Sequence, residues 1–316
     1  MPEFVVGVNL PWLDYGQDFG RSAWRPRGGL AQPERRERLR RELGELAASG
    51  ASLVRLWLLG DGRSGLVENA DGRPLGLDEH FFPDMDAALA ALAEAGLRGL
   101  LVLMDFLWFA PARRVRGVRL GGRRDHVRDP ALRTRLLEHV LAPIAERYGR
   151  RPEVAGWDLM NEPEWATLGV GTLDPRRAIA RREMRLFLGE LAAVFHERAR
   201  QPLCVGLASA RFTPLLEGLA LDEDQVHWYE SLDSLTTLAR PVAPSRPEGR
   251  PPLLGEFPTR GASVSPARIL EIAREAGYSG ALAWSALAAD RATDRAAGLS
   301  AVADWTGQRQ PARPRA

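Results

Sequence analysis

The sequence predicts an α/β fold, a single (β/α)8 barrel, from three observations. Short apolar runs typical of buried parallel strands alternate with helical patterns along almost the whole chain. Eight strand–helix units in a row are what a closed parallel barrel contains. Connections from a helix to the next strand are mostly short, whereas those leaving the early strands are long. A barrel builds its binding site from long loops at the C-terminal ends of its strands.

Each predicted element follows from a local pattern. The strands are short apolar runs between turn signals, at residues 4–8, 53–58, 97–104, 154–160, 203–208, 225–229, 252–256 and 280–284. The helices are predicted at residues 33–49, 84–95, 130–148, 175–199, 213–219, 232–239, 266–276 and 292–303. Several helices begin with proline in the first turn, and several end at glycine, as helix termini favour.

The long connections are residues 10–32, 59–83, 105–129 and 162–174. A proline-rich link at 240–251 is the exception to the short connections before a strand. We expect residues 1–307 to form the barrel. Residues 308–316, rich in arginine and proline, are expected to be a disordered tail.

Composition excludes several classes of protein. The 316 residues are 45% hydrophobic, enough for a sizeable core, and all 43 basic residues are arginine, balanced by 41 acidic residues. The arginines are spread through helical patterns, so we expect no nucleic-acid partner. One cysteine, Cys204, allows no internal disulfide and fits a reducing compartment. Without a visible signal peptide or a span-length apolar stretch, we expect a cytoplasmic protein that binds no membrane. The oligomeric state stays open.

Two glutamates carry the functional prediction. One apolar run ends in Asn161-Glu162-Pro163, and another, about ninety residues later, ends in Gly255-Glu256-Phe257. A carboxylate where a parallel strand stops lies at the mouth of the sheet, where ligands bind. Two facing carboxylates at one mouth are what glycoside hydrolysis requires.

Five markers occur in order at the ends of the predicted strands. They are Arg55, the pair Asn161-Glu162, the pair His227 and Tyr229, Glu256, and Trp284. In this set the sequence resembles the retaining glycoside hydrolases of clan A, most closely family 5, which includes cellulases and mannanases. The resemblance covers nearly the whole chain.

The resemblance implies a retaining β-glycosidase that hydrolyses β-linked glucosides, mannosides or oligosaccharides by double displacement. Glu162 would be the acid/base, with a pKa raised by apolar surroundings, and Glu256 the nucleophile. Arg55 and Tyr229 would hold Glu256 ionised through charge-assisted hydrogen bonds. No cofactor and no metal is implied, and a carbohydrate is the expected partner.

Further roles follow from the same resemblance and from residue chemistry. Asn161 would hold the sugar 2-hydroxyl, and His227 would orient the acid/base or a sugar hydroxyl. The residues expected to bind the sugar through ring faces or polar groups are Trp284, Trp12, Trp108, Trp165, Asn9 and Asp105.

Competing interpretations stay open at this point. A large ring also pins down a long loop, and Glu256 with Arg55 is also the pattern of a structural ion pair. Many family 5 members carry histidine near the end of strand three, where this chain has Asp105. A catalytically silent carbohydrate-binding barrel and a transglycosylase with the same site are the alternative functions. The sequence leaves the sugar, the linkage and exo or endo action unspecified.

Overall fold

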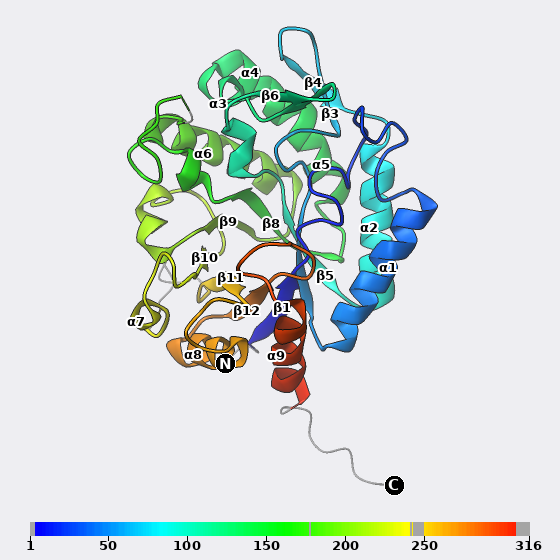
Figure 1. Cartoon of the computed structure of the whole chain (residues 1–316). Helices are drawn as coiled ribbons and strands as arrows, with labels where there is room; N and C mark the ends of the chain where they lie inside the picture. The colour runs from blue at the N-terminus through cyan, green and yellow to red at the C-terminus, as the bar shows by residue number, and fades with distance from the viewer. Residues whose placement is uncertain (1–3, 177, 241, 243–249, 308–316) are drawn as a thin grey trace.

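A closed parallel barrel forms the centre of the computed structural model, which describes residues 4–176, 178–240, 242 and 250–307 (Figure 1). Its strands are β1 (Val5–Asn9), β2 (Leu53–Trp57), β5 (Arg98–Val102), β8 (Val154–Asn161), β9 (Leu203–Leu207), β10 (Gln225–His227), β11 (Leu253–Pro258) and β12 (Gly280–Trp284). Strand β1 pairs in parallel with both β2 and β12, and this pairing closes the barrel. The predicted fold class is confirmed.

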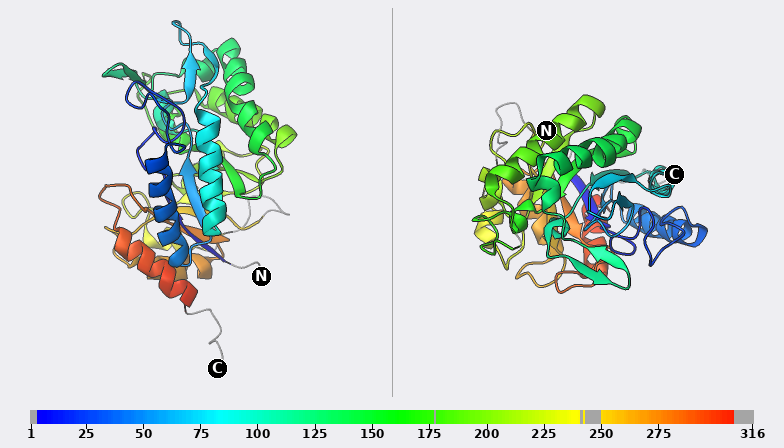
Figure 2. Two further views of the ribbon diagram at one scale, coloured as in Figure 1. Left: turned by 90° about the vertical axis from the view of Figure 1, so that its right-hand side faces the viewer. Right: turned by 90° about the horizontal axis from the view of Figure 1, so that it is seen from above.

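Helices surround the barrel, with α1 and α2 side by side (Figure 2). The longer ones are α1 (Pro33–Ala48), α2 (Phe81–Ala95), α4 (Pro130–Leu136), α5 (Ala142–Tyr148), α6 (Arg181–Arg198), α8 (Pro266–Ala276) and α9 (Arg295–Gly307). Helices α4 and α5 continue one another through a π-helical turn, Leu137–Leu141, just before Pro143, which has no N–H for a regular helix bond. Helices α2 and α8 end at left-handed glycines, Gly96 and Gly277, as predicted.

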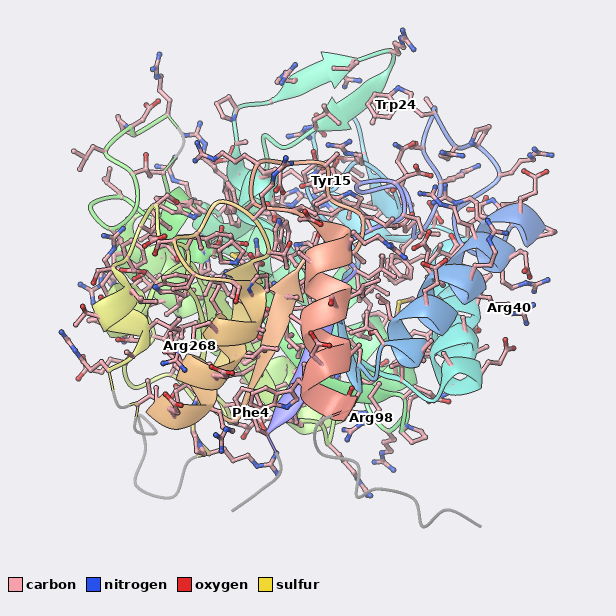
Figure 3. All side chains as sticks on the ribbon, turned by 60° about the horizontal axis from the view of Figure 1, so that its bottom comes forward. Phe4, Tyr15, Trp24, Arg40, Arg98 and Arg268 are labelled. Atoms are coloured by element: carbon pink, nitrogen blue, oxygen red, sulfur yellow. The ribbon has the colours of Figure 1, made fainter. Side chains whose placement is uncertain are left out.

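The arginines lie on different sides of the surface, as expected from their spread along the chain. Figure 3 shows Arg40, Arg98 and Arg268 well apart from one another. Arg40 pairs with Glu94 at 2.7 Å and Arg268 with Glu271 at 2.7 Å. Such exposed pairs contribute little stability, so these arginines act mainly as solvated surface.

The helix predicted at 175–199 begins later than expected, at Arg181. The residues before it pair with the loop after β8 instead. The Ile179 N–H donates to the Ala166 carbonyl at 2.7 Å, and the Leu168 N–H donates to the Ile179 carbonyl at 2.9 Å. These bonds hold the backbone extended where the sequence predicts a helix.

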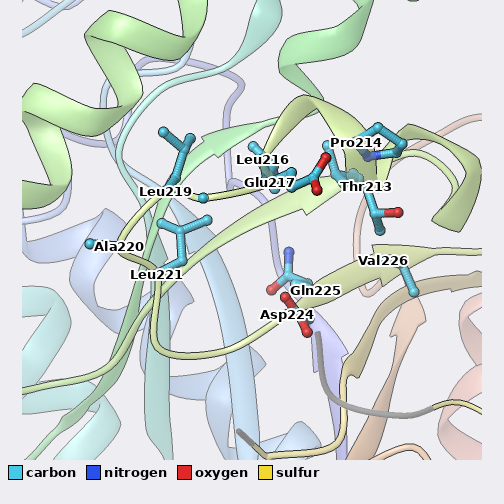
Figure 4. A pocket seen from close by; sticks show the side chains of 12 residues that line it. Thr213, Pro214, Leu216, Glu217, Leu219, Ala220, Leu221, Asp224, Gln225 and Val226 are labelled. Atoms are coloured by element: carbon cyan, nitrogen blue, oxygen red, sulfur yellow. The ribbon is translucent and has the colours of Figure 1, made fainter. Parts of the chain in front are cut away.

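Two other predicted helices are largely missing, so the outer layer is thin beside β9 and β10. Residues 213–219 are replaced by a 3₁₀-helix, Ala210–Leu215, which contains Pro214, and 232–239 by one turn, α7 (Leu235–Leu238). The missing helices leave a cavity of about 600 Å³ on the outer side of the barrel (Figure 4). Leu216, Leu219 and Val226 are among its lining side chains. We call it the outer-wall cavity.

The long connections contain structure that the sequence did not predict. Two hairpins form, β3 (Leu66–Glu68) with β4 (Pro74–Leu77) and β6 (Arg113–Val115) with β7 (Val118–Leu120), and a short helix α3 (Asp125–Arg128) follows them. Arg123 donates to Glu68 at 2.7 Å and joins the two loops.

No helix among the described residues combines the length and apolar character needed to cross a bilayer. The predicted tail, 308–316, and most of the 240–251 link lie outside the described residues.

Candidate active site

The ends of β8 and β11 bring the two glutamates together. An oxygen of Glu162 lies within 4.8 Å of an oxygen of Glu256, and His227 offers a ring nitrogen within 4.8 Å of each. The strand register shifts between Val226 and His227, which places His227 opposite Glu256 on β11. Such irregularities re-aim side chains at the rim of a barrel. Retaining glycosidases hold their carboxyl groups about 5–5.5 Å apart, and this pair is close enough for that mechanism.

Glu162 is held in a special backbone conformation and by two donors. Its φ of 49° and ψ of 53° are left-handed, which non-glycine residues adopt mainly where the surroundings enforce it. Trp165 Nε1 donates to Oε2 at 3.0 Å, and His227 Nδ1 lies 2.9 Å from Oε1. Burial raises the pKa of Glu162 to about 7, against the opposing effects of the Arg55 charge and the Trp165 hydrogen bond. Near neutral pH, a large fraction of this carboxyl carries the proton that a general acid needs.

Glu256 has stronger partners for its ionised form. Arg55 Nη1 donates to Oε1 at 2.6 Å, and the Tyr229 hydroxyl donates to Oε2 at 2.7 Å. The pKa of Glu256 is raised, because burial outweighs the lowering effects of His227, the positive charge of Arg55 and the Tyr229 hydrogen bond. The two carboxyl groups therefore differ in environment as an acid and a nucleophile must.

His227 lies between the glutamates and is neutral near pH 7. Burial lowers its pKa to about 4. Its Nδ1 is 2.9 Å from Glu162 and 3.6 Å from Glu256, and its Nε2 has no hydrogen-bond partner among the described residues. We therefore assign the ring proton to Nδ1, where it is donated to Glu162. The side chains of Glu162, His227 and Glu256 also offer oxygen and nitrogen atoms of the kind that coordinate Zn²⁺.

Arg55 is fully buried and links β2 to three other strands. It donates to Asp158 on β8 at 2.7 Å as well as to Glu256 on β11. It also donates to Asn9 Oδ1 at 3.2 Å and to Asn161 Oδ1 at 2.8 Å. Asp158 was not predicted as a site residue, although a charged residue inside a buried apolar strand is a usable signal.

Asn9 is placed differently from the prediction. It is fully buried, and its Nδ2 donates to the Gly255 carbonyl at 2.9 Å. The prediction that Asn9 binds the sugar is wrong, because no part of its side chain reaches the pocket. It supports Arg55 from within the barrel.

A pocket of about 420 Å³ opens above the glutamates, and we call it the mouth pocket. The aromatic rings that line it are Trp12, Tyr15, Trp57, Phe106, Trp165, Tyr229 and Trp284. Trp12, Trp57 and Trp284 pack edge to face, with centroids 5.8–6.2 Å apart. Flat rings of this kind suit the apolar faces of sugar rings. Trp284, whose peptide bond to Ser285 is cis, donates from Nε1 to Asp290 at 2.8 Å.

Some residues that line the mouth pocket were not predicted from the sequence. They are Leu107, Ser231, Leu232, Asp290, Arg291 and Ala292, mostly from the loops after β10 and β12. Nothing in their local sequence distinguishes them from ordinary loop residues, so only the fold identifies them.

Trp108 is the second predicted sugar-binding residue that the structure contradicts. It is fully buried and packs beside Arg123, whose guanidinium lies 5.4 Å from the ring centroid, and His126. Trp108 pins the loop that follows β5, and its ring is not available to a sugar.

Comparisons with known proteins point to one group of enzymes. No protein-family model matches the chain. The mannan endo-1,4-beta-mannosidase of Mytilus edulis is 27% identical over 161 residues, which are 51% of this chain and 40% of that protein. The aligned part thus spans less than half the length of the curated relative.

Solved structures match over much more of the chain. The endo-1,4-beta-mannanase of Eisenia fetida superposes with a TM-score of 0.78 at 20% identity, covering 96% of this chain and 91% of that one. The beta-mannanase of Mytilus edulis gives 0.73 at 20% identity, covering 95% and 90%. A GH5_18 protein from Streptomyces cattleya, solved with Manβ1-4GlcNAc, gives 0.68 at 15% identity, covering 99% and 82%. The chain resembles family 5 glycoside hydrolases of clan A. The resemblance expected from the sequence is confirmed.

Proposed function

We propose that this protein is a retaining β-glycosidase that acts on β-linked mannosides or manno-oligosaccharides. The observation that carries the proposal is the pair Glu162 and Glu256, which lie within 4.8 Å of each other at one barrel mouth with partners that suit opposite roles. The mannose preference rests on the mannan-degrading relatives and on the neighbour solved with Manβ1-4GlcNAc.

The reaction would proceed in two displacements. Glu256 attacks the anomeric carbon as the glycosidic C–O bond breaks, and Glu162 gives its proton to the departing oxygen. Glu162, now ionised, then takes a proton from water. The water oxygen attacks the anomeric carbon, the ester bond to Glu256 breaks, and both carboxyl groups return to their starting states. Two inversions leave the product in the β configuration.

The remaining side chains would bind and orient the substrate. Asn161, 5% exposed, is proposed to hold the sugar 2-hydroxyl. Trp12, Trp165 and Trp284 line the mouth pocket and are proposed to contact the ring faces of successive sugars.

A screen of aryl β-glycosides and β-linked oligosaccharides, followed by proton NMR, tests the proposal. We expect turnover of mannosides above glucosides, with the β anomer of the product appearing first. No turnover of any substrate would favour the silent carbohydrate-binding barrel. An α anomer formed first would remove Glu256 as the nucleophile. Product analysis at high acceptor concentration separates a hydrolase from a transglycosylase.

A further inference from the structure

Asp105 follows β5 at the edge of the mouth pocket, and its two oxygens serve different partners. Oδ1 accepts the Leu107 N–H at 2.8 Å and thereby starts the 3₁₀ turn Phe106–Phe109. Oδ2 accepts from Asn161 Nδ2 at 3.1 Å and from Trp57 Nε1 at 3.4 Å. The side chain is 5% exposed, so water competes poorly for these bonds.

Both ends of the Asn161 side-chain amide form hydrogen bonds. Arg55 Nη2 donates to its Oδ1 at 2.8 Å, while its Nδ2 donates to Asp105. Rotating the amide by half a turn would set NH₂ against the guanidinium and the carbonyl against the carboxylate. While Asp105 is ionised, both contacts would be repulsive, so the amide then has a single stable orientation. Burial raises the pKa of Asp105 to about 7, so this argument applies above neutral pH.

Among the described residues, the hydrogen bonds with Arg55 and Asp105 leave one donor of Asn161 unused. Nδ2 carries two hydrogens, and one is taken by Asp105. The second is the group that Asn161 can offer to a sugar hydroxyl. Its direction depends on the carboxylate of Asp105, because Arg55 alone constrains only the carbonyl end.

We infer that Asp105 is a positioning residue, which fixes the Asn161 amide so that its free N–H meets the 2-hydroxyl of the sugar above Glu256. The inference rests on the proposed function, since it concerns the same reaction. It gives Asp105 a role exerted through Asn161 rather than through a direct contact with the substrate.

The test compares matched aryl β-mannosides with and without the 2-hydroxyl. Above neutral pH, where Asp105 is ionised, we expect Asp105→Ala to lower kcat/KM on the 2-hydroxy substrate on the order of 10- to 100-fold, the scale of a hydrogen bond to a charged group. On the 2-deoxy substrate the same variant should lose less than about threefold, because the positioned contact is already absent. The double variant Asn161→Ala/Asp105→Ala should lose no more than Asn161→Ala alone.

Trp57→Phe is the matched control, because it removes the other side-chain donor to Oδ2 and leaves Asn161 untouched. Its loss should be the same on both substrates. Thermal unfolding and near-UV circular dichroism check that each variant folds. If Asp105→Ala does not fold, Asp105→Asn replaces it, because it keeps the volume and removes the charge. It is measured on the same two substrates and in the same double variant with Asn161→Ala.

Equal losses on the two substrates, or additive losses in the double variant, would overturn the inference and leave the proposed function intact. A wild-type protein that cleaves neither substrate would overturn the proposed function, and the inference with it.

Discussion

The mouth pocket and the outer-wall cavity differ in the chemistry of the side chains around them, and their volumes do not reflect this difference. The outer-wall cavity is the larger, about 600 Å³ against 420 Å³. It arises where two helices are reduced to short turns, and leucine side chains line it together with polar ones such as Thr213 and Glu217. Gln225 lines it, yet the amide of Gln225 donates inward to Asp158 at 2.8 Å. The cavity lies in a gap of the helical layer, and Glu217 and Asp224 are the acidic side chains that line it among the described residues.

The mouth pocket is smaller but chemically concentrated. Side chains from β2, β8, β11 and the loop after β10 line it, and next to Glu256 the buried charges of Arg55 and Asp158 are paired. Burying a charge is costly unless it is paired, so such a cluster survives where it serves a purpose. A functional site is identified by convergent, mutually dependent polar groups rather than by volume.

The largest expected effect comes from removing the nucleophile. Glu256→Ala should lower kcat by about 10⁴-fold or more, the scale of losing a covalent catalyst. Added azide should restore part of the turnover with an α-configured product, because a small anion then displaces the leaving group once. Glu217→Ala, at the outer-wall cavity, is the matched control and should leave kcat unchanged. If both variants behave alike, the distinction between the two cavities fails.

Arg55 should matter for stability as well as for turnover. Arg55→Ala leaves Asp158 and Glu256 buried without their cation, which should cost about 3–5 kcal/mol in the free energy of unfolding measured in urea. Arg181→Ala removes an exposed guanidinium that donates to the Pro214 carbonyl beside the outer-wall cavity, and should cost less than about 1 kcal/mol. Similar losses of stability in the two variants would show that the buried charges below the mouth pocket matter no more for folding than an exposed arginine beside the outer-wall cavity.

The sequence predicted the barrel well because each strand is a short apolar run with its own boundary signals. It failed beside β9 and β10, where residues 213–219 and 232–239 have helical composition but form only short turns. It also failed at residues 178–179, where pairing with the loop after β8 overrides local propensity. Local pattern predicts an element well only where no tertiary partner competes for its backbone.

The site was predictable where residues end strands and unpredictable where loops decide. Trp108 and Trp165 both follow strands, yet one is buried under Arg123 and the other donates to Glu162. Glu164, two residues after Glu162, is fully buried and accepts the Ala208 N–H, so its role is structural. Composition cannot separate such neighbours, because loop geometry alone decides which side chain faces the pocket.

Tyr229→Phe should produce an intermediate effect. Losing the 2.7 Å hydrogen bond to Glu256 should cost about 1.5–3 kcal/mol of transition-state stabilisation, roughly 10- to 100-fold in kcat/KM. That bond favours the ionised carboxylate, so its loss raises the pKa of Glu256 further. The acidic limb of the pH–rate profile should therefore move to higher pH. An unchanged rate and an unchanged limb would remove Tyr229 from the catalytic group.

Trp165→Phe should produce the smallest change, a shift in the alkaline limb. Trp165 Nε1 donates to Glu162, and this bond lowers a carboxyl pKa that burial has raised to about 7. Without the donor, the pKa of Glu162 rises further, so the protonated acid persists to higher pH. A hydrogen bond worth about 0.5–1.5 kcal/mol corresponds to roughly 0.4–1 pH unit.

The alkaline limb of kcat/KM, which reports the free enzyme, should move upward by that amount in Trp165→Phe. Trp284→Phe removes a ring from the same pocket, but its indole donates to Asp290 and not to Glu162. It should weaken substrate binding, seen as a higher KM, and leave the limb in place. A limb that stays fixed in Trp165→Phe, or that moves in both variants, would show that Glu162 is not the group that sets it.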